Sequence, residues 1–446
     1  MESLRRQLRN LTVPIFMEIA LVMLVGFVDT IMLSRVGNDP AGAVGFVNMM
    51  LIGPAFLVYQ FVSVGAGIVC AQYFAAGHRQ RLVQIVGLAL ALSVVFGFGV
   101  SALLYFKADT FLAWIDISPD QFEDAKTYLE ITGGLSFFQA VGFIFSSSLR
   151  SVDKVKAPMY VTVLANILNA LGNYALIFGN WGCPELGVAG AAWATALSRV
   201  VSFVLMGTIH TVTHIRVYPL RWFYPFPWRE LKNLVKIGIP AMSEELSYCL
   251  SQVVIGYFIN QIGKDAMTTR TYVMNSVMFV FLFCAAITQG GDILVGHLVG
   301  RDKYRPAYLV GTFFLRWSMV ITLACSVALA CAGPWLLDWV SHGDRYIVET
   351  GSFILWIDVL LEVGRVRNIF ACGTLRAAGD AVFPVMVGVT VQWTVAVGFA
   401  WCVGMGLHGG LIAFWCAFAL DENLRGIILM RRWHTMGWVG KNLVRS

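Results

Sequence analysis

The sequence has few charged residues. Asp, Glu, Lys and Arg together make up 13% of its 446 residues, whereas hydrophobic residues make up 58% and the mean hydropathy is +0.72. A chain with so little polar surface cannot cover a water-soluble globule of this size. The composition therefore excludes an ordinary soluble protein and indicates that lipid surrounds most of the chain.

Motifs of enzymes and of ATP-driven pumps are also missing. The sequence contains no glycine-rich loop of the Walker type, no His-Glu-x-x-His and no Gly-x-Ser-x-Gly. The nine cysteines show no Cys-x-x-Cys spacing, which indicates neither a disulfide framework nor a zinc site. We therefore expect no enzyme, no metal site and no cofactor.

Long apolar runs are what the sequence has in abundance. A helix needs roughly 20 residues to cross the hydrocarbon core of a bilayer, and apolar runs of that length recur along the whole chain. They predict an all-α polytopic membrane protein with twelve transmembrane helices, at residues 11–33, 43–74, 82–106, 128–149, 158–178, 188–211, 234–262, 272–299, 307–340, 347–375, 383–403 and 411–430.

Basic residues are unevenly distributed over the predicted loops. They gather at the two ends of the chain and in every second loop, as with Arg79 and Arg81, while an intervening loop holds Asp120 and Glu123. Loops rich in Lys and Arg stay on the cytoplasmic side. This pattern predicts a cell (inner) membrane protein with both termini in the cytoplasm, and it accounts for the net charge of +6 without nucleic-acid binding.

The two halves of the sequence match each other at one fixed offset. The spacing from Pro14 to Pro240 also separates Glu18 from Glu244, Gly37 from Gly263, Asp39 from Asp265, Leu149-Arg150 from Leu375-Arg376, and Pro158 from Pro384. A constant register over these positions indicates an internal duplication. It predicts two pseudo-symmetric six-helix lobes, residues 1–214 and 234–446, joined by a cytoplasmic linker at 215–233, with a cleft between the lobes and a short cytoplasmic tail.

Ionisable residues inside the spans are candidate functional residues, because a charge at membrane depth is costly unless it is paired or hydrated. Asp29 in the first span has no basic residue within one helical turn, so it is either a proton or cation site or a hydrogen-bonded structural acid. Glu18 lies earlier in the same span. In the second lobe Glu244 and Glu245 point about 100° apart, and the repeat aligns Glu244 with Glu18.

Two further sets of polar residues lie on single helix faces. Glu362 and Arg365 are spaced i,i+3 in the tenth span, so they form either an internal salt bridge or a pair that proton or substrate binding breaks and remakes. In the fifth span Asn166, Asn169 and Asn173 share one face, which suits either helix–helix hydrogen bonding or a hydrated ion pocket. The pair Asp421 and Arg425 is spaced for a structural bridge, and Arg199, Arg270 and Asp292 receive no role.

With these features the sequence resembles the multidrug and toxic compound extrusion (MATE) family, and the resemblance extends over nearly the whole chain. The motifs that carry the resemblance are Pro14 with Phe27-Val28-Asp29-Thr30, the pairs Leu149-Arg150 and Leu375-Arg376, and Leu186-Gly187-Val188-Ala189-Gly190-Ala191-Ala192. The resemblance implies a bacterial antiporter that exports organic compounds in exchange for H⁺ or Na⁺, with Asp29 as a coupling residue.

The site residues of the family carry over only in part. One branch pairs the first-span acid with an Asn, an Asp and a Thr, which fall on Asn169, Asn173 and Thr195, so an acid is replaced by Asn173. Another branch has acids at the positions of Tyr248 and Arg365. Glu244 and Glu362 lie one turn from those two positions and could substitute for the missing acids. The loss of carboxylates favours H⁺ over Na⁺.

The leading hypothesis is therefore cation-coupled export of amphipathic, mainly cationic, small molecules by alternating access. The substrate cleft is expected to contain Glu18, Glu244, Glu245, Tyr248, Glu362 and Arg365. A flippase for lipid-linked saccharides, an exporter of an anionic or zwitterionic metabolite such as a flavin, a membrane-embedded enzyme and a passive channel are the alternatives. We expect a monomer whose partners are small organic substrates and lipids.

Overall fold

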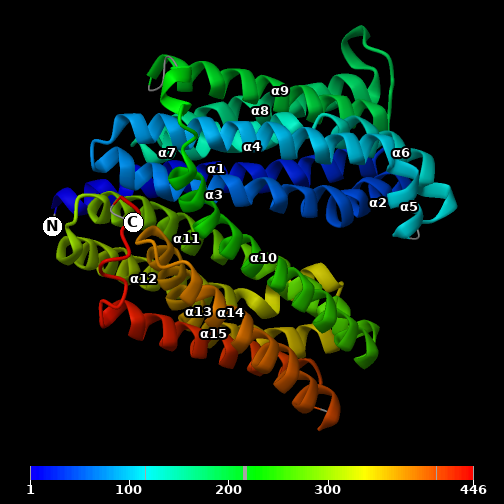
Figure 1. Cartoon of the computed structure of the whole chain (residues 1–446). Helices are drawn as coiled ribbons and strands as arrows, with labels where there is room; N and C mark the ends of the chain where they lie inside the picture. Colours follow the sequence, from blue (N-terminus) through cyan, green and yellow to red (C-terminus); the bar gives the residue numbers. More distant parts are fainter. Residues whose placement is uncertain (1, 116, 214–217, 408, 445–446) are drawn as a thin grey trace. The chain divides into compact units, whose positions relative to one another are not determined.

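The computed structural model describes residues 2–115, 117–213, 218–407 and 409–444. Every regular secondary-structure element in these ranges is a helix (Figure 1). Residues 214–217, where the predicted first lobe ends and the predicted linker begins, lie outside the described residues. Helix α10 begins at Trp228, directly after Pro227, so the last residues of the predicted linker are helical.

Twelve long helical segments follow one another in the part of the chain that the structure describes. Eight of them are apolar enough to cross a membrane by length and composition. These eight segments are α1 (Glu2–Ser34), α2 with α3 (Asn38–Val47 and Gly53–Ala75), α4 (Arg79–Phe106), α8 (Lys156–Phe178), α9 (Val188–Thr213), α11 (Lys264–Gly300), α12 (Tyr304–Ser341), and α14 (Val382–Val391) with its continuation to Gly406. The bent pair α6 (Pro119–Gly134) and α7 (Phe137–Ser151) forms a ninth.

The other three segments are long but carry more charge. They are α10 (Trp228–Ile262), α13 (Arg345–Ala377) and α15 (Gly410–His434). Their charged residues include Glu362, Arg365 and Arg425, which lie on faces turned toward protein rather than lipid. The predicted all-α polytopic fold is confirmed, and α5 (Ala108–Trp114) is a short additional helix between two spans.

The fourth span, predicted at residues 128–149, contains a break that the sequence analysis did not predict. It breaks between α6 and α7 with a bend of 44°. Gly133 and Gly134 precede the break, and glycine weakens a helix because it has the greatest backbone freedom. At the break the buried Ser136 hydroxyl lies 2.8 Å from the hydroxyl of Tyr59 and 2.9 Å from that of Ser101. These hydrogen bonds hold the broken turn inside the bundle.

The chain divides into two compact units. One contains Met17–Met242, and the other contains Met1–Phe16 together with Ser243–Ser446. Both boundaries fall inside a helix, two residues after Pro14 in α1 and two residues after Pro240 in α10. The division therefore follows the same offset as the sequence repeat. Each of these two helices contributes to both units.

Glycines allow α3 and α10 to approach closely within the unit Met17–Met242. A Cβ atom at Gly65 would lie 2.7 Å from the carbonyl oxygen of Leu234, and one at Gly238 would lie 2.6 Å from that of Phe61. Both distances are shorter than any van der Waals contact, so neither position accepts a side chain without movement of the backbone. Small residues commonly permit such approaches between membrane helices.

Candidate functional site

A hydrogen-bonded polar network joins three helices of the unit Met17–Met242, called the first-lobe unit. The amide nitrogen of Asn173 donates to a carboxylate oxygen of Asp29 at 2.5 Å and lies 3.4 Å from the side-chain oxygen of Asn169. The amide nitrogen of Asn169 donates to the hydroxyl of Thr195 at 3.2 Å. The four residues predicted to bind the coupling ion thus lie together, and their binding of an ion stays a prediction.

Helix geometry explains how the network forms. Asn169 and Asn173 are separated by one turn, so they lie on the same face of α8. That face packs against α9, which supplies Thr195. Asn169, Asn173 and Thr195 are buried, and Asp29 of α1 is half-buried. Among the described residues, no hydrogen-bond partner contacts the buried side-chain oxygen of Asn173 or the amide nitrogen of Asn166, the third residue of the predicted stripe, which has no part in this network.

The sequence analysis missed one charged member of this region. Arg199 lies one turn after Thr195 in α9 and interacts electrostatically with Asp29, Tyr59 and Tyr128. Its guanidinium carbon lies 5.1 Å from the centre of the Phe56 ring. The signal that could have identified Arg199 is its i,i+4 spacing from Thr195, which places both side chains on one helix face.

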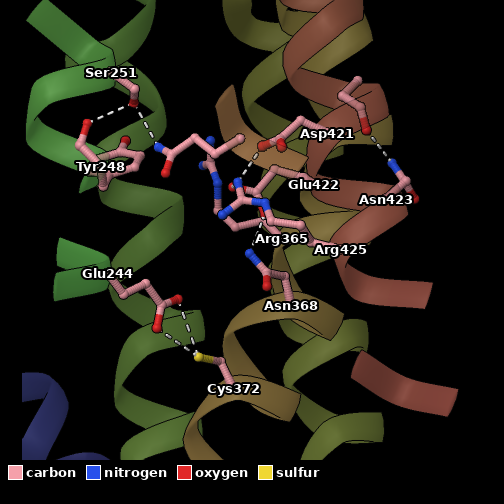
Figure 2. A network of polar contacts seen from close by, with 12 residues as sticks. Glu244, Tyr248, Ser251, Arg365, Asn368, Cys372, Asp421, Glu422, Asn423 and Arg425 are labelled. Carbon is pink, nitrogen blue, oxygen red and sulfur yellow. Dashed lines mark hydrogen bonds and ion pairs between the residues drawn. The ribbon is translucent and has the colours of Figure 1, made fainter. Parts of the chain in front are cut away.

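The second unit contains a dense cluster of buried charges (Figure 2). Arg365 forms an ion pair with Glu362 inside α13, which is the salt bridge that the spacing predicts. Arg425 of α15 pairs with Asp421, again as predicted, and also with Glu422 at 3.1 Å. The amide nitrogen of Asn368 donates to Glu422 at 2.8 Å, which connects α13 to α15.

An open pocket lies beside this cluster. Its empty space, including the part continuous with the surroundings, is about 450 Å³. Aromatic side chains such as Tyr248 and Trp415 line it together with Arg365, Glu422 and Arg425. Such a mixture of apolar walls and a few fixed polar groups is typical of sites for small organic molecules.

The remaining predicted cleft residues lie elsewhere. Glu18 pairs with Arg150 at 3.4 Å in the first-lobe unit, and Glu244 pairs with Arg376 at 3.5 Å in the other. The thiol of Cys372 also lies 3.3 Å from both carboxylate oxygens of Glu244, as Figure 2 shows. Glu245 is exposed, and neither Glu244 nor Glu245 is among the described residues that line the pocket.

Sequence comparison decides the family of this chain. A sequence model of the MatE family matches residues 14–175 and 240–402, which together are most of the chain and begin one repeat offset apart. The chain belongs to the MATE family. An uncharacterised transporter of Bacillus subtilis (strain 168), YisQ, is 35% identical over 97% of this chain and 95% of its own length. A probable multidrug resistance protein NorM of Thermotoga maritima is 25% identical over 96% and 91%.

Solved MATE structures share the same architecture. A MATE crystal structure in a bent conformation matches with a TM-score of 0.89 at 18% identity, covering 98% of this chain and 96% of the other. A MOP superfamily transporter from Pyrococcus furiosus matches with a TM-score of 0.87 at 17% identity over the same fractions. These findings confirm a multi-pass MATE efflux transporter and exclude the enzyme alternative, because members of the family are transporters.

Proposed function

We propose that this protein is an antiporter that exports amphipathic, mainly cationic, small organic molecules in exchange for H⁺ or Na⁺. The observation that carries the proposal is the carboxylate of Asp29, which is held inside the first span by the neutral amide of Asn173. An intramembrane acid without a paired cation in contact is a default candidate for ion coupling.

Helix α1 gives a route from ion binding to conformational change. A charged Asp29 accepts a charge-assisted hydrogen bond from Asn173, and such bonds are roughly twice as strong as neutral ones. Protonation removes that charge and weakens the attachment of α1 to α8. Because α1 belongs to both units, a change in its attachment biases the equilibrium between inward-open and outward-open states.

The pocket of the second unit supports the substrate class. Tyr248 and Trp415 offer aromatic faces for a flat hydrophobic molecule. Asp421 and Glu422 line the pocket together with Arg365 and Arg425. Beside it lie two further acids, Asp358 and Glu362, and one further arginine, Arg270, so the acids exceed the arginines by one. An excess of carboxylates attracts organic cations and disfavours anions.

One observation favours a second candidate, the export of an anionic or zwitterionic metabolite such as a flavin. Arg365 and Arg425 both line the pocket, and a guanidinium group binds carboxylates and phosphates through paired hydrogen bonds. The carboxylates that already pair with both arginines weigh against this candidate.

We also propose that the antiporter is a monomer in the cell inner membrane, with both termini in the cytoplasm.

Transport in proteoliposomes tests both candidates. Purified protein is reconstituted with an imposed pH gradient or Na⁺ gradient, and the fluxes of ethidium, a cation, and flavin mononucleotide, an anionic flavin, are measured for the wild type and for Asp29→Asn. The matched control is Asp39→Asn, because Asp39 is an exposed acid at the start of α2. We expect gradient-driven ethidium flux that Asp29→Asn abolishes and Asp39→Asn leaves unchanged.

The other outcomes separate the candidates. Flux of flavin mononucleotide without flux of ethidium would replace the cation-export proposal by the second candidate. Ethidium flux that persists unchanged with no ion gradient would remove antiport altogether. Gradient-driven flux that is indifferent to Asp29→Asn would move the coupling role to another acid, such as Glu362.

A further inference from the structure

Two glutamine side chains line the pocket of the second unit. Gln252 lies in α10, and Gln392 begins the π-helical stretch Gln392–Phe399 that continues α14. Such π-helical turns are frequent at functional sites. An amide side chain carries an acceptor oxygen and a donor nitrogen. What each glutamine offers to a bound molecule therefore depends on which of these two atoms the protein already uses.

Arg270 fixes the orientation of Gln252. The Nη2 atom of Arg270 donates to the side-chain oxygen of Gln252 at 2.9 Å. A guanidinium group has donors and no acceptor, so the amide oxygen must face Arg270. Gly256, one turn after Gln252, leaves room for the guanidinium, because a Cβ atom at that position would lie 3.1 Å from its Nη1 atom. The amide nitrogen of Gln252 is therefore left as a donor.

Ser251 fixes the orientation of Gln392 in the opposite sense. The hydroxyl of Ser251 donates its single hydrogen to the backbone carbonyl of Tyr248 at 2.8 Å (Figure 2), so the hydroxyl oxygen can only accept further hydrogen bonds. The amide nitrogen of Gln392 donates to that oxygen at 2.7 Å. The amide oxygen of Gln392 is therefore left as an acceptor.

The two remaining amide atoms are complementary to each other. Neither the nitrogen of Gln252 nor the oxygen of Gln392 has a hydrogen-bond partner among the described residues, and neither is enclosed by them. Gln392 contacts Ser251, which directly precedes Gln252 in α10, so both amides belong to the same part of the pocket lining. Fixed polar groups of this kind orient a ligand and give specificity, whereas the aromatic walls beside them bind flat apolar molecules of many kinds.

We propose that Gln252 and Gln392 form a donor–acceptor subsite that selects flat aromatic substrates carrying both a carbonyl group and an N–H group, as amides and lactams do. The carbonyl oxygen of the substrate accepts from Gln252, and its N–H group donates to Gln392. This inference rests on the proposed function, because it defines the substrate class of the same pocket. A site built to hydrogen-bond its substrate discriminates against an analogue that lacks the bonding groups.

Binding of two uncharged tricyclic probes to the purified full-length protein tests the subsite. Phenanthridinone is a lactam with adjacent carbonyl and N–H groups, and phenanthridine has the same ring system without the lactam. Both are neutral at neutral pH, so the charges around the pocket affect their relative affinity little. Equilibrium dialysis of the detergent-solubilised protein gives a Kd for each probe. We expect the wild type to bind the lactam more tightly than phenanthridine.

Two substitutions remove the two functions separately. Gln392→Met removes the acceptor and leaves the hydroxyl of Ser251 bonded to Tyr248. Gln252→Glu keeps an oxygen for Arg270 and replaces the donor by a second acceptor. We expect each to lower the preference for the lactam, which is the ratio of the two Kd values, by about tenfold. Gln261→Glu is the matched control, because Gln261 is exposed near the end of α10 and does not line the pocket.

Three results would overturn the proposal. The first is a wild type that does not prefer the lactam, and the second is an unchanged preference in whichever of the two pocket variants fold. The third is an equal weakening of both probes, which would show that the glutamines support the pocket without selecting its ligand. The measurement needs no ion gradient, so a failure of ethidium transport would contradict the proposed function without affecting this result.

Discussion

The carboxylate of Glu18 lies 3.4 Å from the guanidinium group of Arg150, and the internal repeat reproduces this pair in the other unit. Glu244 and Arg376, which the repeat aligns with Glu18 and Arg150, are 3.5 Å apart. All four side chains are largely buried, with exposed fractions of 12–22%. In each unit an ion pair therefore joins two helices that the repeat relates to each other: α1 and α7 in one unit, and α10 and α13 in the other.

We predict that these pairs matter for stability chiefly when one partner is missing. Arg150→Gln leaves the charge of the partly exposed Glu18 unpaired and is expected to cost about 1–3 kcal/mol. The double variant Glu18→Gln with Arg150→Gln removes both charges and should be less destabilised than the single variant. Thermal unfolding in detergent, followed by size-exclusion chromatography, measures the difference. Additive losses in the double variant would mean that the two side chains do not interact.

The pair around Arg425 should be more sensitive because it is more deeply buried. Arg425→Gln leaves the carboxylates of Asp421 and Glu422 without their cation. The loss falls in a buried environment, because the side chains of Arg425 and Asp421 are only 7% and 3% exposed. We expect a loss of about 3–5 kcal/mol and low yields of folded protein. Arg345→Gln is the control, because Arg345 pairs with Glu349 at an exposed position where ion pairs contribute little. Equal thermal stability of the two variants would contradict the prediction.

Tyr248 should contribute to substrate affinity through its aromatic face. In Tyr248→Leu the pocket loses a ring that can contact an organic cation, so the KM for ethidium should rise by about three- to tenfold while kcat changes little. Tyr248→Phe keeps the ring and should resemble the wild type. A series of initial export rates in proteoliposomes gives both constants. If the Leu and Phe variants behave alike, the ring of Tyr248 does not bind the substrate.

The close approach of α3 and α10 predicts a strict requirement for glycine. Gly238→Ala places a methyl group 2.6 Å from the carbonyl oxygen of Phe61, and Gly65→Ala places one 2.7 Å from that of Leu234. We expect either variant to lose about 1–3 kcal/mol through forced backbone movement. Gly99→Ala in α4 is the control, because nothing lies within 4 Å of its added methyl group. Thermal stability in detergent should fall for the first two variants only.

Much of the fold could be predicted because its signals are local. The length of each apolar run reports a spanning helix, and the constant offset between the two halves reports the duplication. The unit boundaries two residues after Pro14 and two residues after Pro240 were not predicted. The break between Gly134 and Phe137 was not predicted. It depends on how Ser136 contacts Tyr59 and Ser101, and those residues are far away in the sequence.

The order of residues is enough to identify the side chains that are chemically unusual for a membrane span, including Asp29, Glu362 and Arg365. Which of these side chains meet is known only from the folded chain. Asp29 and Asn173 are 144 residues apart, and Arg199 interacts with Asp29 because α1 and α9 pack near the same face of α8. Helical periodicity fixes the face on which a side chain lies, whereas the partner of that face is set by the packing of whole helices, which the order of residues does not reveal.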